Sequence, residues 1–166
     1  MAAKTGTYTL IASNTLAAIT TEITFSSIPA TYTDLVVVVN YKANNGGKYL
    51  TMRLNGDTGT NYSRTEIFAD GTSITSQNLT NESYAYINSV YASTGTWATF
   101  ILNLNDYSNT TTFKSIVTRS NSSTYVGMNA NLWRSTAAIN TIFLTALGSG
   151  YDVGSTFKLY GIEAAK

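Results

Sequence analysis

The sequence contains no cysteine and no histidine, and each absence excludes a class of chemistry. Without cysteine the chain has no disulfide, no thiolate nucleophile and no zinc–sulfur site. Without histidine it lacks the usual general base near neutral pH and the commonest metal ligand. These absences favour a protein that works by binding rather than by catalysis. We therefore expect no enzymatic activity, no catalytic residues, no cofactor and no bound metal.

Charged side chains are also scarce. They make up 11% of the 166 residues, against about a quarter in an average protein, and threonine, serine and asparagine take their place. The formal net charge is +1 and no run of lysine or arginine occurs, so we expect no nucleic-acid partner. A polar surface with little charge suits contact with other protein or glycan surfaces, because few charges must be desolvated.

Long apolar runs are absent as well. The longest, Leu35 to Val39, is far too short to span a bilayer, and no apolar signal segment follows the first residues. We expect a soluble protein that is made in a cytoplasm and has no membrane partner. The length fits one domain, which we place at residues 7–166, with residues 1–6 as an N-terminal arm.

Strand-forming residues dominate the sequence. Threonine, valine, isoleucine, tyrosine and phenylalanine favour extended backbone, and turn residues separate about ten short segments of this kind. Ile19, Ile23 and Phe25 alternate with polar residues, which predicts a half-buried strand over 19–25. Leu35 to Val39 is apolar at every position, which predicts a central strand.

Two further predictions concern local structure. The turn residues from Asn44 to Gly47 predict a hairpin that joins the valine-rich strand to a return strand over 49–54. The polar stretch from Thr72 to Ser83 is predicted to be a loop. No segment has the pattern of a crossover helix, so the strands should be antiparallel. The predicted fold class is all-β, an antiparallel two-sheet sandwich that is jelly-roll-like, with a barrel as the alternative.

The nine acidic residues are dispersed, and five of them lie in or beside predicted turns: Asp34, Asp57, Asp70, Asp106 and Asp152. Aspartate is frequent in turns because its carboxylate accepts hydrogen bonds from nearby backbone. The segment from Asn55 to Asn61 has closely spaced oxygen atoms that could indicate a calcium site. It lacks the further carboxylates and the closing glutamate of a calcium loop, so a tight turn is the favoured interpretation.

Tyrosine is unusually common, with twelve residues against six phenylalanines. Its ring and hydroxyl together are typical of interfaces and of surfaces that contact sugars. Tyr84 and Tyr86 share one face of a predicted strand, and core packing with the hydroxyls at the sheet edge is an equally open interpretation. The candidate partner contacts are Tyr84, Tyr86 and Tyr91, together with Met1, Ala2, Ala3 and Lys4 of the arm.

The chain resembles a group of small bacteriophage structural proteins in four stretches that occur in the same order. They are Ile28 to Leu35 with the valine run that follows, Leu54 to Ser63, Trp133 with Ala138 to Asn140, and Gly154 to Ile162. Proteins of this group are labelled tail-fibre, minor structural or capsid-decoration proteins. The resemblance spans most of the chain from Ile19 onward, but it does not separate head proteins from tail proteins.

The resemblance implies a non-enzymatic part of a virion, made in the host cytoplasm. A tail-fibre subunit normally has a long repetitive or helical shaft, and none is present, which favours a capsid decoration (cement) protein on the outer surface of the shell. The expected partners are then the major capsid protein and further copies of this chain, as a homotrimer. The alternative is a tail-fibre or receptor-binding module that recognises host-surface glycan.

Overall fold

The computed structural model describes residues 7–46, 49–87 and 94–163. These ranges contain twelve strands and no helix, which confirms the predicted all-β class. The strands are β1 (Tyr8–Thr15), β2 (Glu22–Phe25), β3 (Asp34–Tyr41), β4 (Leu50–Leu54), β5 (Tyr62–Ala69), β6 (Ile74–Glu82), β7 (Ala85–Tyr86), β8 (Ala98–Leu104), β9 (Lys114–Asn121), β10 (Val126–Trp133), β11 (Ile142–Ala146) and β12 (Thr156–Ile162).

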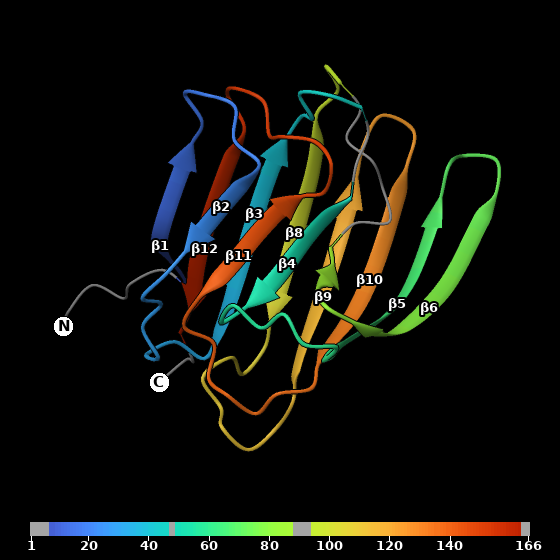
Figure 1. The fold of residues 1–166 in the computed structure, drawn as a ribbon. Coiled ribbons are helices and arrows are strands. Elements are labelled where there is room, and N and C mark those ends of the chain that lie inside the picture. The colour runs from blue at the N-terminus through green and yellow to red at the C-terminus, as the bar shows by residue number, and fades with distance from the viewer. Residues whose placement is uncertain (1–6, 47–48, 88–93, 164–166) are drawn as a thin grey trace.

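The strands form two antiparallel sheets that pack face to face (Figure 1). The larger sheet has eight strands in the order β1-β12-β3-β8-β9-β10-β5-β6, and the smaller has four in the order β2-β11-β4-β7. Apolar side chains from the facing surfaces of the two sheets fill the space between them, as in other sandwiches. The predicted antiparallel two-sheet sandwich is therefore confirmed.

Eight of the strands have the connectivity of a jelly roll. β1, β12, β3 and β8 lie side by side in the larger sheet, and the chain alternates between them and the four strands of the smaller sheet. Two hairpins are inserted into this plan, β5–β6 after β4 and β9–β10 after β8. Both extend the larger sheet beyond β8, and Figure 1 shows β5 and β6 projecting past the smaller sheet.

The core lies between the two sheets. The valine-rich strand β3 is paired on both sides, with β12 and with β8, as predicted for a central strand. Leu35, Val37 and Val39 of β3 are fully buried, and Met52 and Leu54 of β4 join the same core from the smaller sheet. Each such side chain contributes about 1.5–3 kcal/mol to stability by leaving water.

The sequence pattern does not predict two of the strands, β1 and β6. The loop expected over Thr72 to Ser83 is wrong, because Ile74–Glu82 forms strand β6 and pairs with β5. Nearly every residue of β6 is exposed, so neither face carries the apolar alternation that marks a half-buried strand. The backbone hydrogen bonds to β5 hold this polar segment in an extended conformation.

The hairpin expected between the valine-rich strand and its successor is also wrong. β3 pairs with β12 and β8 in the larger sheet, whereas β4 pairs with β11 and β7 in the smaller sheet. Both strands are rich in buried side chains, so each contributes to the core from its own layer. The strand expected over 19–25 is shorter than predicted, since β2 begins at Glu22 and Ile19 is 55% exposed.

Candidate interaction surface

The outer face of the two inserted hairpins carries exposed apolar side chains. Val126, Met128 and Leu132 project from β10, Ile67 from β5 and Ile74 from β6, and all are exposed. The strand register places Met128 directly opposite Ile67. We refer to these five side chains as the outer apolar face.

The inner face of the same strands is polar, which inverts the usual pattern. Arg64 and Glu66 of β5 and Asn129 and Asn131 of β10 are all buried. In most sheets with one solvent-exposed face, the apolar side chains pack on the core and the polar side chains face the solvent. On β10 the apolar side chains meet solvent instead, and the asparagines point inward. A contiguous exposed apolar patch of this kind is typical of a surface that another molecule covers.

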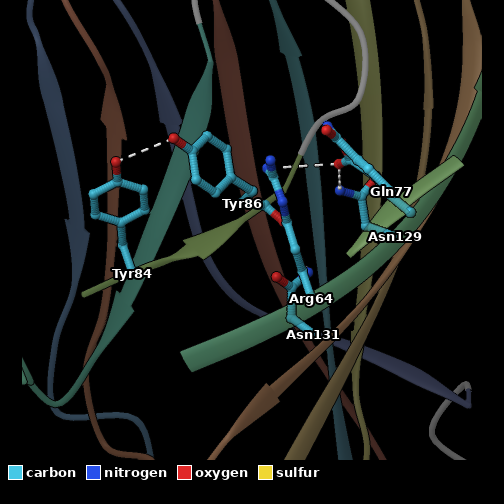
Figure 2. A network of polar contacts seen from close by, with 7 residues as sticks. Arg64, Gln77, Tyr84, Tyr86, Asn129 and Asn131 are labelled. Atoms are coloured by element: carbon cyan, nitrogen blue, oxygen red, sulfur yellow. Dashed lines mark hydrogen bonds and ion pairs between the residues drawn. The ribbon is translucent and has the colours of Figure 1, made fainter. Parts of the chain in front are cut away.

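The buried polar side chains of the inner face contact one another (Figure 2). The Glu66 carboxylate accepts a hydrogen bond from Asn129 Nδ2 at 2.8 Å and another from the Gln77 amide on β6. The Arg64 guanidinium lies 3.5 Å from the same carboxylate. The network neutralises a charge that would be costly to bury alone.

Tyr86 completes this network on the side of β7. The Arg64 guanidinium carbon lies 3.7 Å from the centroid of the Tyr86 ring, a cation–π contact. Asn131 Nδ2 donates a hydrogen bond to the Tyr86 backbone carbonyl at 2.8 Å. Figure 2 shows the Tyr86 ring between Arg64 and Tyr84, with the two tyrosine hydroxyls 3.1 Å apart. Burial, aided by the Tyr84 hydrogen bond, raises the pKa of Tyr86, so its hydroxyl remains protonated near neutral pH.

The structure brings two of the predicted contact residues together. The rings of Tyr84 and Tyr86 have centroids 5.0 Å apart and meet edge to face. Tyr86 also meets Tyr49 at 5.2 Å, so its ring is engaged by neighbours within the fold, whereas Tyr84 has the Arg53 guanidinium 5.9 Å from its ring. The other predicted contacts lie outside the described residues: Met1, Ala2, Ala3, Lys4 and Tyr91.

The turn over residues 55–61 is organised by the Asp57 carboxylate. One carboxylate oxygen accepts a hydrogen bond from the Gly59 backbone N–H at 2.8 Å. The other accepts hydrogen bonds from Asn61 Nδ2 at 2.9 Å and from Trp133 Nε1 at 2.7 Å. The backbone has positive φ at Asn55 and at the glycine that follows it, as a tight turn requires. The favoured interpretation of this segment as a turn is confirmed.

The pKa of Asp57 predicts how acid affects this turn. Partial burial alone would raise the pKa of its carboxyl, but the hydrogen bonds from Trp133, Asn61 and Gly59 outweigh burial and lower it. A lowered folded-state pKa adds stability above the unfolded-state pKa of about 3.9, and this stability is lost as the pH falls through the folded-state value.

We therefore expect Asp57→Asn to reduce the free energy of unfolding by about 1 kcal/mol at neutral pH, a modest value because solvent screens this turn. The difference from the natural chain should shrink below about pH 3, where the natural carboxyl is protonated as well. Urea unfolding of both chains across this pH range is the measurement, with Thr58→Ala in the same turn as the control. A difference that did not change with pH would contradict the assigned role of the carboxylate.

The segments Leu54 to Ser63 and Trp133 to Asn140 contact each other through Asn55 and Trp133. Asn55 Nδ2 donates a hydrogen bond to the Ala138 carbonyl at 2.8 Å, and the Asn140 backbone N–H donates one to Asn55 Oδ1 at 2.9 Å. The Trp133 ring stacks on Tyr62 with centroids 6.3 Å apart. These residues connect the turn after β4 to the segment between β10 and β11.

Two further segments are linked in the same way. The Ile28 backbone N–H donates a hydrogen bond to the Asn140 carbonyl at 3.0 Å. Gly161 of β12 lies against the ring of Tyr32, so closely that a side chain at Gly161 would overlap the ring. These residues thus hold loops and strands of the fold together.

Two other turn aspartates accept hydrogen bonds from local backbone, as predicted. The Asp70 carboxylate accepts hydrogen bonds from the Ser73 and Thr72 N–H groups, which hold its pKa well below the usual range. Asp152 accepts one from the Val153 N–H at 2.8 Å and pairs with Lys42 at 3.0 Å. Within the described ranges, no cluster of three or more acidic side chains could hold a metal, and no helix has the length and hydropathy to cross a membrane.

Sequence reasoning missed the polar network around Arg64 and Glu66. A signal was available, because both residues occupy one face of β5 while Ser63, Thr65 and Ile67 occupy the other. Two charged residues at this spacing stand out in a chain with so few charges. The alternation reveals two chemically different faces, but it does not reveal that the polar face is the buried one.

No family model matches the chain, and no curated protein matches it significantly. Among solved structures, it is similar to the crystal structure of a protein of unknown function from Shewanella oneidensis MR-1, with 10% sequence identity and a TM-score of 0.25. The match covers 98% of this chain and 78% of that one. A likeness this weak assigns no function, so the proposals below depend on the chain's own residues and geometry.

Proposed function

We propose that this chain is a non-enzymatic structural protein of a bacteriophage particle, which decorates the outer surface of the capsid shell and stabilises it. The observation that carries the proposal is the outer apolar face, with Ile67, Val126 and Met128 each at least half exposed, because it marks the chain as a subunit of a larger assembly, whichever component covers the face. A soluble monomer rarely exposes a contiguous patch of this kind, whereas a component of a larger assembly covers it. The four stretches that resemble phage structural proteins support the same class of function.

The physical properties of the chain suit attachment to a repetitive shell. A sandwich is a rigid body, and few charges need to be desolvated when its surface is covered, since charged residues make up only 11% of the chain. Individual contacts can be weak, because linked copies raise one another's effective concentration at the surface. A protein that binds the assembled shell, and not its separated subunits, stabilises the shell by mass action.

Particles that lack the chain are therefore expected to assemble, but to release their DNA at a lower temperature than complete particles. Binding at a free concentration about 100 times the dissociation constant adds roughly 2.7 kcal/mol of stability per site. The measurement is dye access to DNA during heating, with purified chain added back as the control. An unchanged release temperature would contradict the decoration function.

A second candidate is a receptor-binding module at the tail that recognises glycan. The observation in its favour is Tyr84, a partly exposed aromatic ring with the Arg53 guanidinium 5.9 Å from its centroid. Such a pair suits the apolar faces and the hydroxyls of a sugar. If particles without the chain kept their release temperature but no longer adsorbed to the host, this candidate would replace the first. Tyr84→Ala should then reproduce the loss of adsorption without unfolding the chain.

A further inference from the structure

We infer that the outer apolar face is the contact surface between two copies of this chain, packed face to face about a two-fold axis. This inference rests on the proposed function, and it names the partner for one surface of the assembling protein. The inverted strands are its starting point, since β10 directs Val126, Met128 and Leu132 to solvent and its asparagines inward. A second sheet laid on this face would give these side chains the apolar surroundings that the rest of the fold does not provide.

The outer surface of β9, β10, β5 and β6, which contains the outer apolar face together with polar side chains around it, is large enough for a stable contact. β9, β10 and β5 have eight residues each, and β6 has nine. With strands about 4.8 Å apart and about 3.3 Å per residue, the four strands present a surface of roughly 19 by 26 Å, or about 500 Å² in projection. The accessible area of a surface covered by side chains exceeds its projection, so it approaches the roughly 800 Å² that each partner buries in a standard interface.

The shape of the face favours a second copy of itself. Ile74 and Val126 project strongly, at 76% and 60% exposure. Between and beside them lie two shallow, open depressions on the same face, one of about 250 Å³ lined in part by Ile67 and Met128, and one of about 210 Å³ that also borders Ile74 and Val126. A surface with both projections and depressions can complement itself after a half turn, when the projections of each copy enter the depressions of the other.

The charge of the face also favours a second copy over a charged partner. Among the outward-facing side chains of the four strands in the described ranges, Arg119 is the charged one, and it lies directly opposite Met128 in the register. A single arginine does not make the charged patch that would select an acidic partner. In a self-contact, the two arginines can remain at the hydrated rim while the apolar side chains meet at the centre.

A two-fold contact differs from the homotrimer that the sequence suggested. A two-fold contact buries the same surface on both copies and closes at two, whereas a ring of three joins two different surfaces. The other edge of the larger sheet supplies the second surface that a ring would need, because Tyr8 and Leu10 of β1 are both more than half exposed. The two arrangements therefore respond differently to substitution at Leu10.

The test is the mass of the purified chain in solution, measured by light scattering and sedimentation over a concentration series. We expect the chain to have twice the mass of one copy at chain concentrations well below about 100 μM, because an interface of standard size is already saturated at about 100 μM. Met128→Lys should weaken the association at least about 100-fold, because the ammonium would be buried without a partner. Met128→Ala should weaken it less, and Leu10→Lys, the matched control at the other edge of the sheet, should leave it unchanged. Circular dichroism confirms that each variant is folded.

A natural chain that is monomeric at about 100 μM, where a standard interface would be saturated, overturns the inference. So does a trimer, or an equal loss of association in folded Met128→Lys and Leu10→Lys. The proposed function fails separately. A chain that forms the two-fold dimer but is absent from purified particles keeps the inference and contradicts the decoration function. A monomeric chain that binds particles contradicts the inference and keeps the decoration function.

Discussion

Replacing Gly161 with alanine is expected to lower the free energy of unfolding by about 3 kcal/mol or more, and this is the largest effect we expect from a single methyl group. A Cβ atom at Gly161 would overlap Cγ of the Tyr32 ring. The ring has little freedom to withdraw, because the Tyr32 backbone N–H contacts the Tyr107 hydroxyl and the next residue, Thr33, donates a hydrogen bond to the Ile162 carbonyl at 2.8 Å. Strand β12 or the segment before β3 must therefore shift.

A double-mutant cycle tests this contact. Gly161→Ala, Tyr32→Ala and the combined variant are compared by urea unfolding, with a coupling expected because the two residues touch. Removing the ring first should relieve most of the cost of the alanine. Strictly additive effects would contradict an overlap between residue 161 and the Tyr32 ring.

Arg64→Ala is expected to destabilise the chain by about 3 kcal/mol, because it removes a cation from beside a buried carboxylate. The side chains of Arg64 and Glu66 are only 6% and 2% exposed, and they lie 3.5 Å apart. The substitution also removes the cation–π contact with Tyr86 and leaves a space between β5 and β7. Chemical unfolding at neutral pH is the measurement.

Two matched variants separate the charge of Arg64 from its shape. Arg64→Lys keeps the positive charge but loses the planar stack on Tyr86, so an intermediate loss of stability is expected. Adding Glu66→Gln to Arg64→Ala removes the uncompensated carboxylate and should recover part of the loss. A loss below about 1 kcal/mol for Arg64→Ala would place this pair in the class of weak surface ion pairs and contradict its burial in the network.

The main features of the fold could be predicted from the sequence where burial leaves a clear pattern. The valine run of β3 is paired along both edges, with β12 and β8, and it is the central strand it was predicted to be, although Val38 on its outer face is only partly buried. β6 could not be predicted, because its side chains meet water on both faces and only backbone pairing makes it a strand. The placement of β3 and β4 in different sheets depends on pairing with strands that are distant in sequence, and a turn motif does not encode that pairing.

The candidate surface was predictable only in part. The proximity of Tyr84 and Tyr86 follows from their spacing, and their hydroxyls do meet. The alternation of Met128 and Asn129 along β10 is just as regular, but the usual rule assigns the apolar side to the core. That assignment is reversed on β10, where Asn129 is buried and Met128 is half exposed.

The number of copies of the chain in purified particles is the most direct test of its proposed function. It can be measured by quantitative mass spectrometry against the major capsid protein of the same particles. A protein that decorates a symmetric shell should be present in a fixed ratio to the shell subunit, with copies on the order of hundreds, because symmetry repeats each binding point. A handful of copies per particle, or none after washing, would contradict the assignment of this chain to the capsid surface.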